Sequence, residues 1–309
     1  DSVKIEEVQA SVIKESSTAL NLYEDGQLDD VIVTGELAKQ YANDPGFVGD
    51  EDGRTVYVDT NKESKTVPFD NLNLRKALYY AVDNETIVDA VLGDGSAAVT
   101  TIVPRSLGTS PESGKDFVDE TGEYKTYDPE KAKEYLEKAK KETGKDSFSF
   151  DILTDDNEGT KKLAEYLQGA FKETLGIETT VTAVTKPIRL DRTAVGKSDF
   201  DMVVTAWGAD YTDVSSFLDL FVTGNAYNRG LYSNPEYDKL IEAARTTNAT
   251  DANARWENYL AADKILEEDA AVIPVFQVVE AHLRNPKMTG YVNHSAGAPY
   301  EYKYLEMTE

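Results

Sequence analysis

The chain has 309 residues, with 32 Lys and Arg against 57 Asp and Glu, so its formal net charge is −25. This acidity argues against a nucleic-acid-binding protein, which needs clustered basic residues to neutralise phosphates, and it disfavours binding to an anionic membrane surface. The absence of cysteine excludes disulfides, thiolate metal sites and cysteine nucleophiles.

The first 44 residues predict two strands that alternate with two helices. Two strands of about six residues make a poor sheet alone, so we expect the rest of this sheet elsewhere in the chain or in sequence that is missing from it. The chain begins with Asp1-Ser2 rather than Met, which leads us to expect a removed targeting signal or a start within a longer protein. The expected strands are 4–13 and 28–33, and the expected helices are 16–24 and 35–44.

The remainder of the chain again alternates strands with helices, which indicates an α/β fold with a mixed or parallel sheet. The strand at 200–207 is apolar enough to be buried on both faces. The charged helix that begins at Asp128-Pro129 reads either as a docking surface or as a solvated amphipathic helix, and we favour the latter. We expect strands at 55–60, 97–103, 148–155, 177–185, 200–207 and 271–279, and helices at 74–83, 84–93, 129–142, 159–176, 187–196, 213–222, 235–246 and 251–268.

No catalytic or metal-binding motif is present. The sequence lacks a G-x-S-x-G elbow, a phosphate loop and a glycine string after a strand, and the spacing of His282 and His294 does not fit a metal site. The acidic stretches at 50–53 and 155–159 do not have the spacing of a calcium loop. We therefore expect no cofactor and no metal.

One group of neighbouring residues indicates a ligand-binding site more specifically. The strand at 200–207 ends in Trp207-Gly208-Ala209-Asp210, and ligands of open α/β sheets bind beyond the carboxyl ends of strands. Trp207 offers an apolar wall, Gly208 allows a close backbone approach, and Asp210 offers a carboxylate for an ammonium group. The alternative is that Trp207 belongs to the core and that Asp210 only caps the next helix. The residues alone leave both interpretations open.

Five stretches resemble, in order, the extracellular solute-binding proteins of the oligopeptide/dipeptide ABC-transporter family (family 5). The segment at 206–221 is similar to the family pattern W-x-a-D-Y-p-D-P, although Val214 stands where a proline is usual. The five stretches are PFDNLNLRKALYYAVDNETIV (68–88), YDPEKAKEYLEKA (127–139), AWGADYTDVSSFLDLF (206–221), YSNPEYDKLIEAA (232–244) and AADKILEEDAAVIPVFQ (261–277).

The resemblance implies a type II periplasmic-binding-protein-like α/β fold that encloses its ligand between two lobes. It implies that residues 1–66 are part of a first lobe, that 67–276 form the second lobe, and that 277–309 return to the first. The crossings near 57–61 and 275–279 would be the hinge.

The resemblance also implies the site residues. Asp210 would hold the α-ammonium of a peptide, with Trp207, Gly208 and Ala209 beside it, and the backbone there would pair with the peptide main chain. Weaker candidates for ligand contact are Val33, Thr34 and Phe276.

The function implied is a non-enzymatic, extracytoplasmic binding protein that delivers short peptides to ABC-transporter permease subunits. Contact with a membrane would occur only through an anchor upstream of this chain. The alternatives are a non-peptide ligand such as a metal chelate or an oligosaccharide, a pheromone-sensing or adhesin role, and an acid-based hydrolase.

Overall fold

The main sheet has seven strands in the order β1-β7-β2-β6-β4-β5, with β3 paired to β7. The structure is a computed structural model that describes residues 3–13, 15–122, 124, 126–298 and 300–308. β4 pairs in parallel with β5 and β6, and the other neighbours are antiparallel. The strands are β1 (Asp30–Ile32), β2 (Phe47–Thr60), β3 (Ala97–Ala98), β4 (Ser149–Asp155), β5 (Glu178–Val184), β6 (Met202–Gly208) and β7 (Val272–Arg284).

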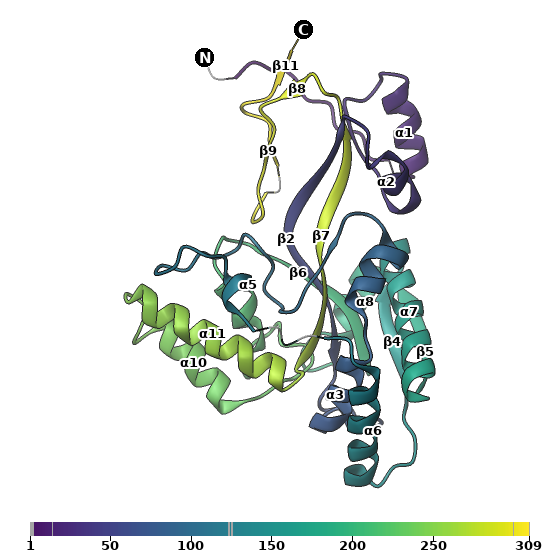
Figure 1. Ribbon diagram of the computed structural model, residues 1–309, viewed down its shortest axis with the longest axis vertical. Helices are drawn as coiled ribbons and strands as arrows, with labels where there is room; N and C mark the ends of the chain where they lie inside the picture. Colours follow the sequence, from purple (N-terminus) through teal and green to yellow (C-terminus); the bar gives the residue numbers. More distant parts are fainter. Residues whose placement is uncertain (1–2, 14, 123, 125, 299, 309) are drawn as a thin grey trace.

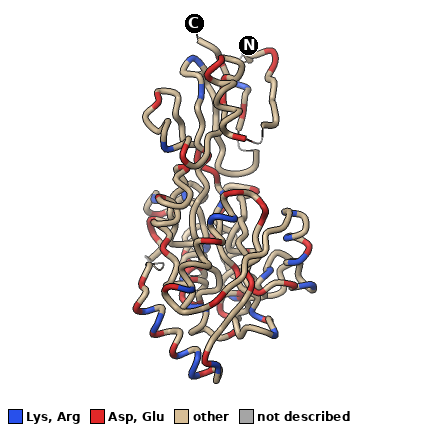
Figure 2. The backbone as a smooth tube through the Cα atoms, turned by 90° about the vertical axis from the view of Figure 1, so that its right-hand side faces the viewer, with Lys and Arg blue, Asp and Glu red and all other residues tan. Residues whose placement is uncertain are grey.

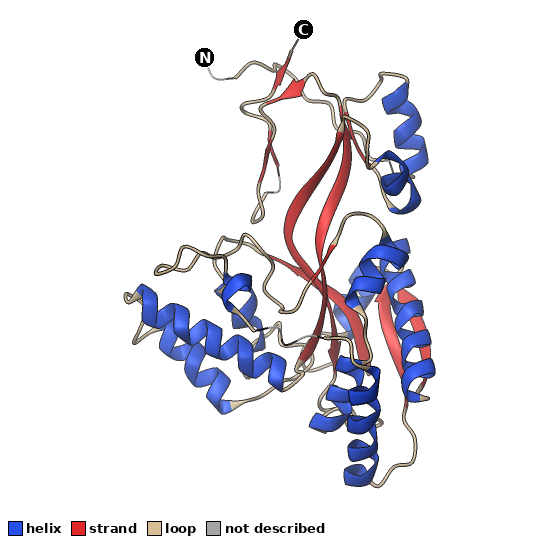
Figure 3. Cartoon of the chain, in the orientation of Figure 1, coloured by secondary structure: helices blue, strands red, loops and turns tan. Residues whose placement is uncertain are grey.

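Two long strands connect the two ends of the molecule. β2 has 14 residues and β7 has 13, so each spans about 45 Å at the usual rise of ~3.4 Å per residue. Figure 3 shows them running from the helix-rich body up to a smaller region that carries α1, α2 and both chain termini. The ladder between them is interrupted between Glu51 and Thr55.

Polar caps and glycines bound the helices where the sequence predicts them. Asp128 accepts a hydrogen bond from the Lys131 amide at the start of α6, and Gly144 adopts a left-handed φ of 66° at its end. The helices are α1 (Ser16–Glu24), α2 (Gly35–Tyr41), α3 (Leu72–Tyr80), α4 (Asn84–Thr86), the π-helical η1 (Ile87–Leu92), α5 (Phe117–Glu120), α6 (Pro129–Thr143), α7 (Glu158–Leu175), α8 (Lys186–Arg192), α9 (Ser215–Leu218), the 3-10 turn η2 (Asp219–Phe221), α10 (Pro235–Arg245) and α11 (Ala252–Glu268).

The two faces of the sheet are buried under different helices. Val56 and Val58 on β2 pack into a core with α3, α6 and α7, whereas Tyr57 between them packs into a second core with α9, α10 and α11. This alternation follows from the two-residue period of a strand. The helices therefore flank the sheet on both sides, with α3, α6 and α7 on one side and α10 and α11 on the other (Figure 1).

A third, smaller core lies in the region that holds the chain termini. Ala19, Leu20 and Ala38 of α1 and α2 pack there against Val31 and against Leu283 of β7. The tail adds two short ladders, which pair β8 (Met288–Thr289) with β11 (Glu306–Met307) and β9 (Val292–Asn293) with β10 (Tyr300–Glu301). The division at residues 66 and 276 stays a prediction.

Two predicted strands are wrong or shortened. Residues 4–13 carry no strand, and Val12 is 98% exposed, because no described strand lies beside them to accept their backbone hydrogen bonds. The strand predicted at 97–103 contains only the two residues of β3. Beyond β3 the chain bends, so that Ile102 and Val103 fill the core under α11 instead of extending the ladder.

The charged helix α6 is a solvated amphipathic helix. Its buried residues are Ala132, Leu136 and Ala139, and its exposed face carries ion pairs such as Lys138–Glu134 at 2.7 Å. Figure 2 shows acidic and basic residues distributed over the whole length of the molecule. Exposed pairs of this kind are screened by solvent and contribute little to stability.

A network of charged side chains links β1, β2 and β7 in the smaller region. His282 of β7 contacts Asp30 of β1 with 2.8 Å between Nδ1 and Oδ1, and Arg284 contacts both Asp30 (3.2 Å) and Asp50 of β2 (2.7 Å). Glu280 and Asp50 each lie 3.8 Å from His282 Nε2. Burial alone would lower the pKa of His282, but the hydrogen bonds and negative charges of these carboxylates raise it to about 9.

The raised pKa of His282 predicts that His282→Gln lowers the unfolding free energy by an amount that depends on pH. The imidazolium stabilises the folded state fully below the unfolded pKa of about 6.5, and this contribution is lost as pH rises through 9. We expect the variant to lose roughly 2–3 kcal/mol of unfolding free energy at pH 6. Urea unfolding of both proteins at pH 6 and pH 9.5 measures this, and an equal difference at the two pH values would contradict it.

Candidate functional site

β6 has one fully paired edge and one open edge. β2 pairs with it along its whole length, from Thr60↔Met202 to Arg54↔Gly208, whereas β4 pairs with it only at Met202 and Val203. No other strand of the described chain pairs with β6. The second edge is therefore without a neighbouring strand from Val204 to Gly208, at the carboxyl end where α/β sheets bind ligands.

Arg189 fixes the place where β4 and β6 diverge. This side chain of α8 is 3% exposed, and it donates to Asp155 at the end of β4 with Nε–Oδ1 of 2.7 Å and Nη2–Oδ2 of 3.2 Å. Its Nη1 donates to Thr205 Oγ1 of β6 at 2.9 Å. A bidentate pair of this kind is geometrically rigid, so the two strand ends are held apart at a fixed position.

Asp210 lies exposed just beyond the end of β6. The neighbouring amide of Ala209 donates to the Gly53 carbonyl at 2.8 Å, and the Asp210 amide donates to Ser216 Oγ at 3.3 Å. Within the described residues, neither a hydrogen bond nor an ion pair to the Asp210 carboxylate is found. The backbone is thus held in place, while the carboxylate is exposed and has no partner among the described residues.

The interpretation of Asp210 as a helix cap is not supported. Asp213, not Asp210, accepts the Ser215 amide at the start of α9, at 2.9 Å. Asp213 also forms a bidentate pair with Arg255 at 2.8 and 2.9 Å. The carboxylate that contacts the first turn of α9 is therefore that of Asp213, the second aspartate of the segment.

Trp207 belongs partly to the core and partly to the surface. It packs against the core beside α9, α10 and α11, and its ring lies 5.0 Å from that of Tyr227, at 60°. Its indole Nε1 is buried and has no hydrogen-bond partner among the described residues. Tyr227 is 51% exposed, so it extends the apolar wall outwards, a contribution that the sequence analysis missed.

The remaining predicted residues lie at different depths. The side chain of Val33 is fully buried in the small core, and its amide donates to the Ala281 carbonyl at 2.9 Å. Thr34 is exposed, with its Oγ1 3.1 Å from Ser16 Oγ. Phe276 is 7% exposed and belongs to the core with α3, α6 and α7. The side chain of Thr34 is accessible to a ligand. The side chains of Val33 and Phe276 are buried, and their contact with a ligand stays a prediction.

The segment between β9 and β10 contacts the end of β6. The Gly297 amide donates to the Ala209 carbonyl at 3.1 Å, and Asn293 Nδ2 donates to the Glu51 carbonyl at 2.8 Å. A Cβ at Gly53 would lie 1.7 Å from the Ser295 carbonyl oxygen. Only glycine at position 53 permits this approach.

Gly53→Ala is therefore expected to displace the segment between β9 and β10. The clash is with backbone, so we expect a loss of about 1–3 kcal/mol of unfolding free energy and faster hydrogen exchange of the Gly297 amide. Gly169→Ala in α7 is the matched control, because a Cβ there meets nothing within 4 Å and should stabilise the helix by about 0.5–1 kcal/mol. Unchanged exchange at Gly297 in Gly53→Ala would contradict the expectation.

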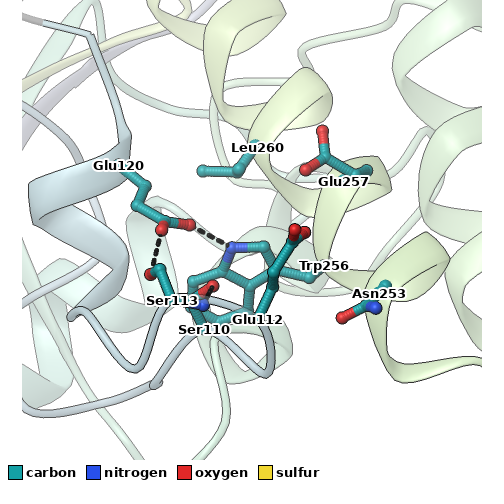
Figure 4. A pocket seen from close by; sticks show the side chains of 8 residues that line it. All are labelled: Ser110, Glu112, Ser113, Glu120, Asn253, Trp256, Glu257 and Leu260. Atoms are coloured by element: carbon teal, nitrogen blue, oxygen red, sulfur yellow. Dashed lines mark hydrogen bonds between the residues drawn. The ribbon is translucent and has the colours of Figure 1, made fainter.

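A separate pocket of about 420 Å³ lies between the loop before α5 and helix α11. Figure 4 shows Trp256 Nε1 and Ser113 Oγ both donating to the Glu120 carboxylate, the former at 2.7 Å. These bonds lower the pKa of Glu120. They anchor the loop to α11, and two further glutamates, Glu112 and Glu257, line the hollow.

The described residues include no group of three or more His, Asp or Glu side chains that could hold a metal ion. Among the same residues, no helix has the length and apolar character needed to cross a membrane.

Residues 1–229 match the family model described as bacterial extracellular solute-binding proteins, family 5. The chain belongs to this family. A dipeptide-binding protein of Lactococcus lactis subsp. cremoris is 32% identical over 97% of the chain and 56% of its own length. The chain thus spans about half the length of the curated relatives it matches.

Solved structures of family 5 proteins share the fold. Listeria monocytogenes OppA bound to peptide superposes with a TM-score of 0.86 at 31% identity, over 100% of this chain and 59% of that one. The structure of the pheromone receptor PrgZ, which was described together with its mode of peptide binding, superposes with a TM-score of 0.84 at 36% identity. The match covers 96% of this chain and 57% of PrgZ. The predicted fold class, a type II periplasmic-binding-protein-like α/β fold, is confirmed.

Proposed function

We propose that this chain is the part of a peptide-binding protein that holds the amino terminus and main chain of a short peptide. The observation that carries the proposal is the unpaired carboxylate of Asp210, placed directly beyond the open edge of β6. An ammonium group forms charge-assisted hydrogen bonds with a carboxylate, and an extended peptide adds to an open strand edge through its backbone. Both features recognise any peptide, whatever its side chains.

The relatives support the same function. Several of the curated relatives are named as dipeptide- or oligopeptide-binding proteins, whereas one is named as a probable deoxycholate-binding protein. One solved relative contains a bound peptide. We infer that this chain acts likewise as a binding protein and not as an enzyme. We place it outside the cytoplasm, where it delivers its ligand to the permease subunits of an ABC importer.

The two long strands support the proposed division into lobes. The cores with α3 to α11 contain residues 56–276, whereas the small core contains residues 19–38 and 281–283. We place the bend between the lobes at Glu51–Thr55, where the β2–β7 ladder is interrupted. The crossings that the resemblance implies, near 57–61 and 275–279, are buried except for the half-buried residues 278–279. Closure about this bend would cover the ligand, and the closed form must bind the ligand more tightly.

Isothermal titration with the complete gene product tests the proposal. We expect di- to pentapeptides with free amino termini to bind with micromolar or tighter affinity, and N-acetylated peptides to bind far more weakly. Mass spectrometry of the ligand that co-purifies should detect peptides. Binding of an oligosaccharide or a metal chelate in place of peptides would overturn the proposal.

A peptide pheromone is the second candidate ligand, because the chain is 36% identical to the pheromone receptor PrgZ. The same titration distinguishes the two functions. A transport protein should bind peptides of varied sequence with similar affinity, whereas a receptor should bind one sequence much more tightly than its scrambled version.

A further inference from the structure

The β9–β10 hairpin has its base in the smaller region, which carries the chain termini. Tyr291, directly before β9, packs against Arg284 of β7, whose Cζ lies 3.7 Å from the centroid of the tyrosine ring. Asn293 Nδ2 of β9 donates to the Glu51 carbonyl of β2 at 2.8 Å. Figure 1 shows β9 extending from this region towards the helix-rich body. The base of the hairpin is therefore attached to β2 and β7 on the side of the bend that carries the termini.

The hairpin tip, residues 295–297, contacts the helix-rich body on the other side of the bend. The Gly297 amide donates to the Ala209 carbonyl at 3.1 Å. Ser295 Oγ donates to the Ser106 carbonyl at 3.3 Å. Ala209 follows β6, and Ser106 lies in the loop between β3 and α5, so both acceptors belong to the body. The hairpin thus spans the bend and touches both regions.

Two packing contacts accompany these hydrogen bonds. Ala296 is half-buried against the core beside α9, α10 and α11. The Ser295 carbonyl oxygen lies against Gly53 in the bend, 1.7 Å from the position that a Cβ would occupy there. Hydrogen bonds and van der Waals contacts are lost within an ångström or two of added distance. A rotation of one region against the other at the bend therefore breaks the contacts of the hairpin tip.

We propose that the hairpin tip is a clasp, whose contacts with the body form when the two regions close and break when they open. The inference rests on the proposed function, which requires these two arrangements, and it adds a segment that sets the balance between them. An interaction made in one of two states shifts their ratio by its own free energy. Two hydrogen bonds and one small apolar contact favour the closed form by a factor of about 5 to 50.

Single-molecule fluorescence energy transfer in the complete gene product tests the clasp. Cysteines introduced at the exposed residues Thr18 of α1 and Lys239 of α10 place one dye on each region, in a version that contains no other cysteine. Without ligand, Ala296→Glu should lower the ratio of closed to open molecules by about 5- to 50-fold, because a carboxylate cannot pack against the apolar core. Ser295→Ala removes one hydrogen bond and should lower this ratio by about 2- to 10-fold.

Ala298→Glu is the matched control, because it adds the same charge to the same segment at an exposed position beyond the tip. It should leave the ratio of closed to open molecules as in the wild type. Peptide affinity gives a second readout. Ala296→Glu should weaken the binding of trialanine and of N-acetyl-trialanine by the same factor, because the clasp acts through the population of the closed form and not through a ligand group.

Three results would overturn the clasp while the proposed function stands. They are an unchanged ratio of closed to open molecules in Ala296→Glu, an equal fall of this ratio in Ala298→Glu, and a loss of affinity in Ala296→Glu for trialanine alone. If the wild type binds no peptide, the proposed function fails, and the ratio measured without ligand still decides whether the clasp exists.

Discussion

Asp210→Asn is expected to lower the affinity for peptides with a free amino terminus by about 10- to 100-fold, measured by titration of the complete gene product. The substitution keeps the size and one oxygen of the side chain but removes the negative charge that pairs with the ligand ammonium. Since the carboxylate has no hydrogen bond or ion pair to another described residue, the substitution should leave the stability of the fold unchanged.

Two controls separate loss of the ammonium contact from a general effect. Asp146→Asn removes an exposed carboxylate from the loop after α6 and should leave affinity unaltered. N-acetylated peptides lack the ammonium group, so wild type and Asp210→Asn should bind them equally weakly. A full loss of affinity for acetylated peptides in the variant alone would show that Asp210 acts through the fold and not through the ligand amine.

Asp263→Asn is expected to stabilise the protein at neutral pH. Asp263 of α11 is fully buried, and its carboxyl group accepts a hydrogen bond from Thr101 Oγ1 at 2.5 Å. Its other oxygen, Oδ2, is buried without a partner among the described residues. Burial raises the pKa of Asp263 to about 7, although the bond from Thr101 acts in the opposite direction.

The sign of the effect follows from the raised pKa. Below about pH 4 the carboxyl group of Asp263 is protonated in both the folded and the unfolded chain, so its ionisation does not lower the unfolding free energy. Between pH 4 and 7 the unfolded chain loses this proton while the folded chain retains it, so the unfolding free energy falls by about 1.4 kcal/mol per pH unit. Above pH 7 the accumulated penalty is about 4 kcal/mol.

Urea unfolding at pH 4 and at pH 8 measures the effect. Asp263→Asn should be more stable than the wild type by several kcal/mol at pH 8, with most of the difference absent at pH 4. Glu257→Gln, an exposed substitution on the same helix, should show no such change. A pH-independent difference between wild type and Asp263→Asn would refute the assignment of a buried, titrating carboxyl group.

Local signals in the sequence predicted most of the body. The strand predicted at 200–207 corresponds to β6, and the helix predicted to begin at Asp128-Pro129 is α6, capped by Asp128. These features depend on residues close in the chain, so periodicity and capping chemistry are enough to find them.

Features that depend on distant pairing could not be predicted. β2 begins at Phe47, eight residues before the predicted strand, because β7 pairs with a segment whose Asp50-Glu51-Asp52-Gly53 resembles a turn. The alternation in residues 4–13 predicts a strand, but in the structure it has no neighbour with which to pair.

The residues of the candidate site could likewise be predicted only where the signal is local in the sequence. Asp210 and Trp207 were found from their position at a strand end and from the resemblance to family 5. Tyr227 was missed, because its proximity to β6 depends on the path of the loop after η2. The sequence contains no local signal for this relation.

A crystal structure of the complete gene product with a bound dipeptide tests the central claim most directly. The account predicts that the ligand nitrogen lies about 2.7–2.9 Å from a carboxylate oxygen of Asp210, with the peptide main chain along the open edge of β6. A ligand amine bound by other groups, with the Asp210 carboxylate left in solvent, would contradict it.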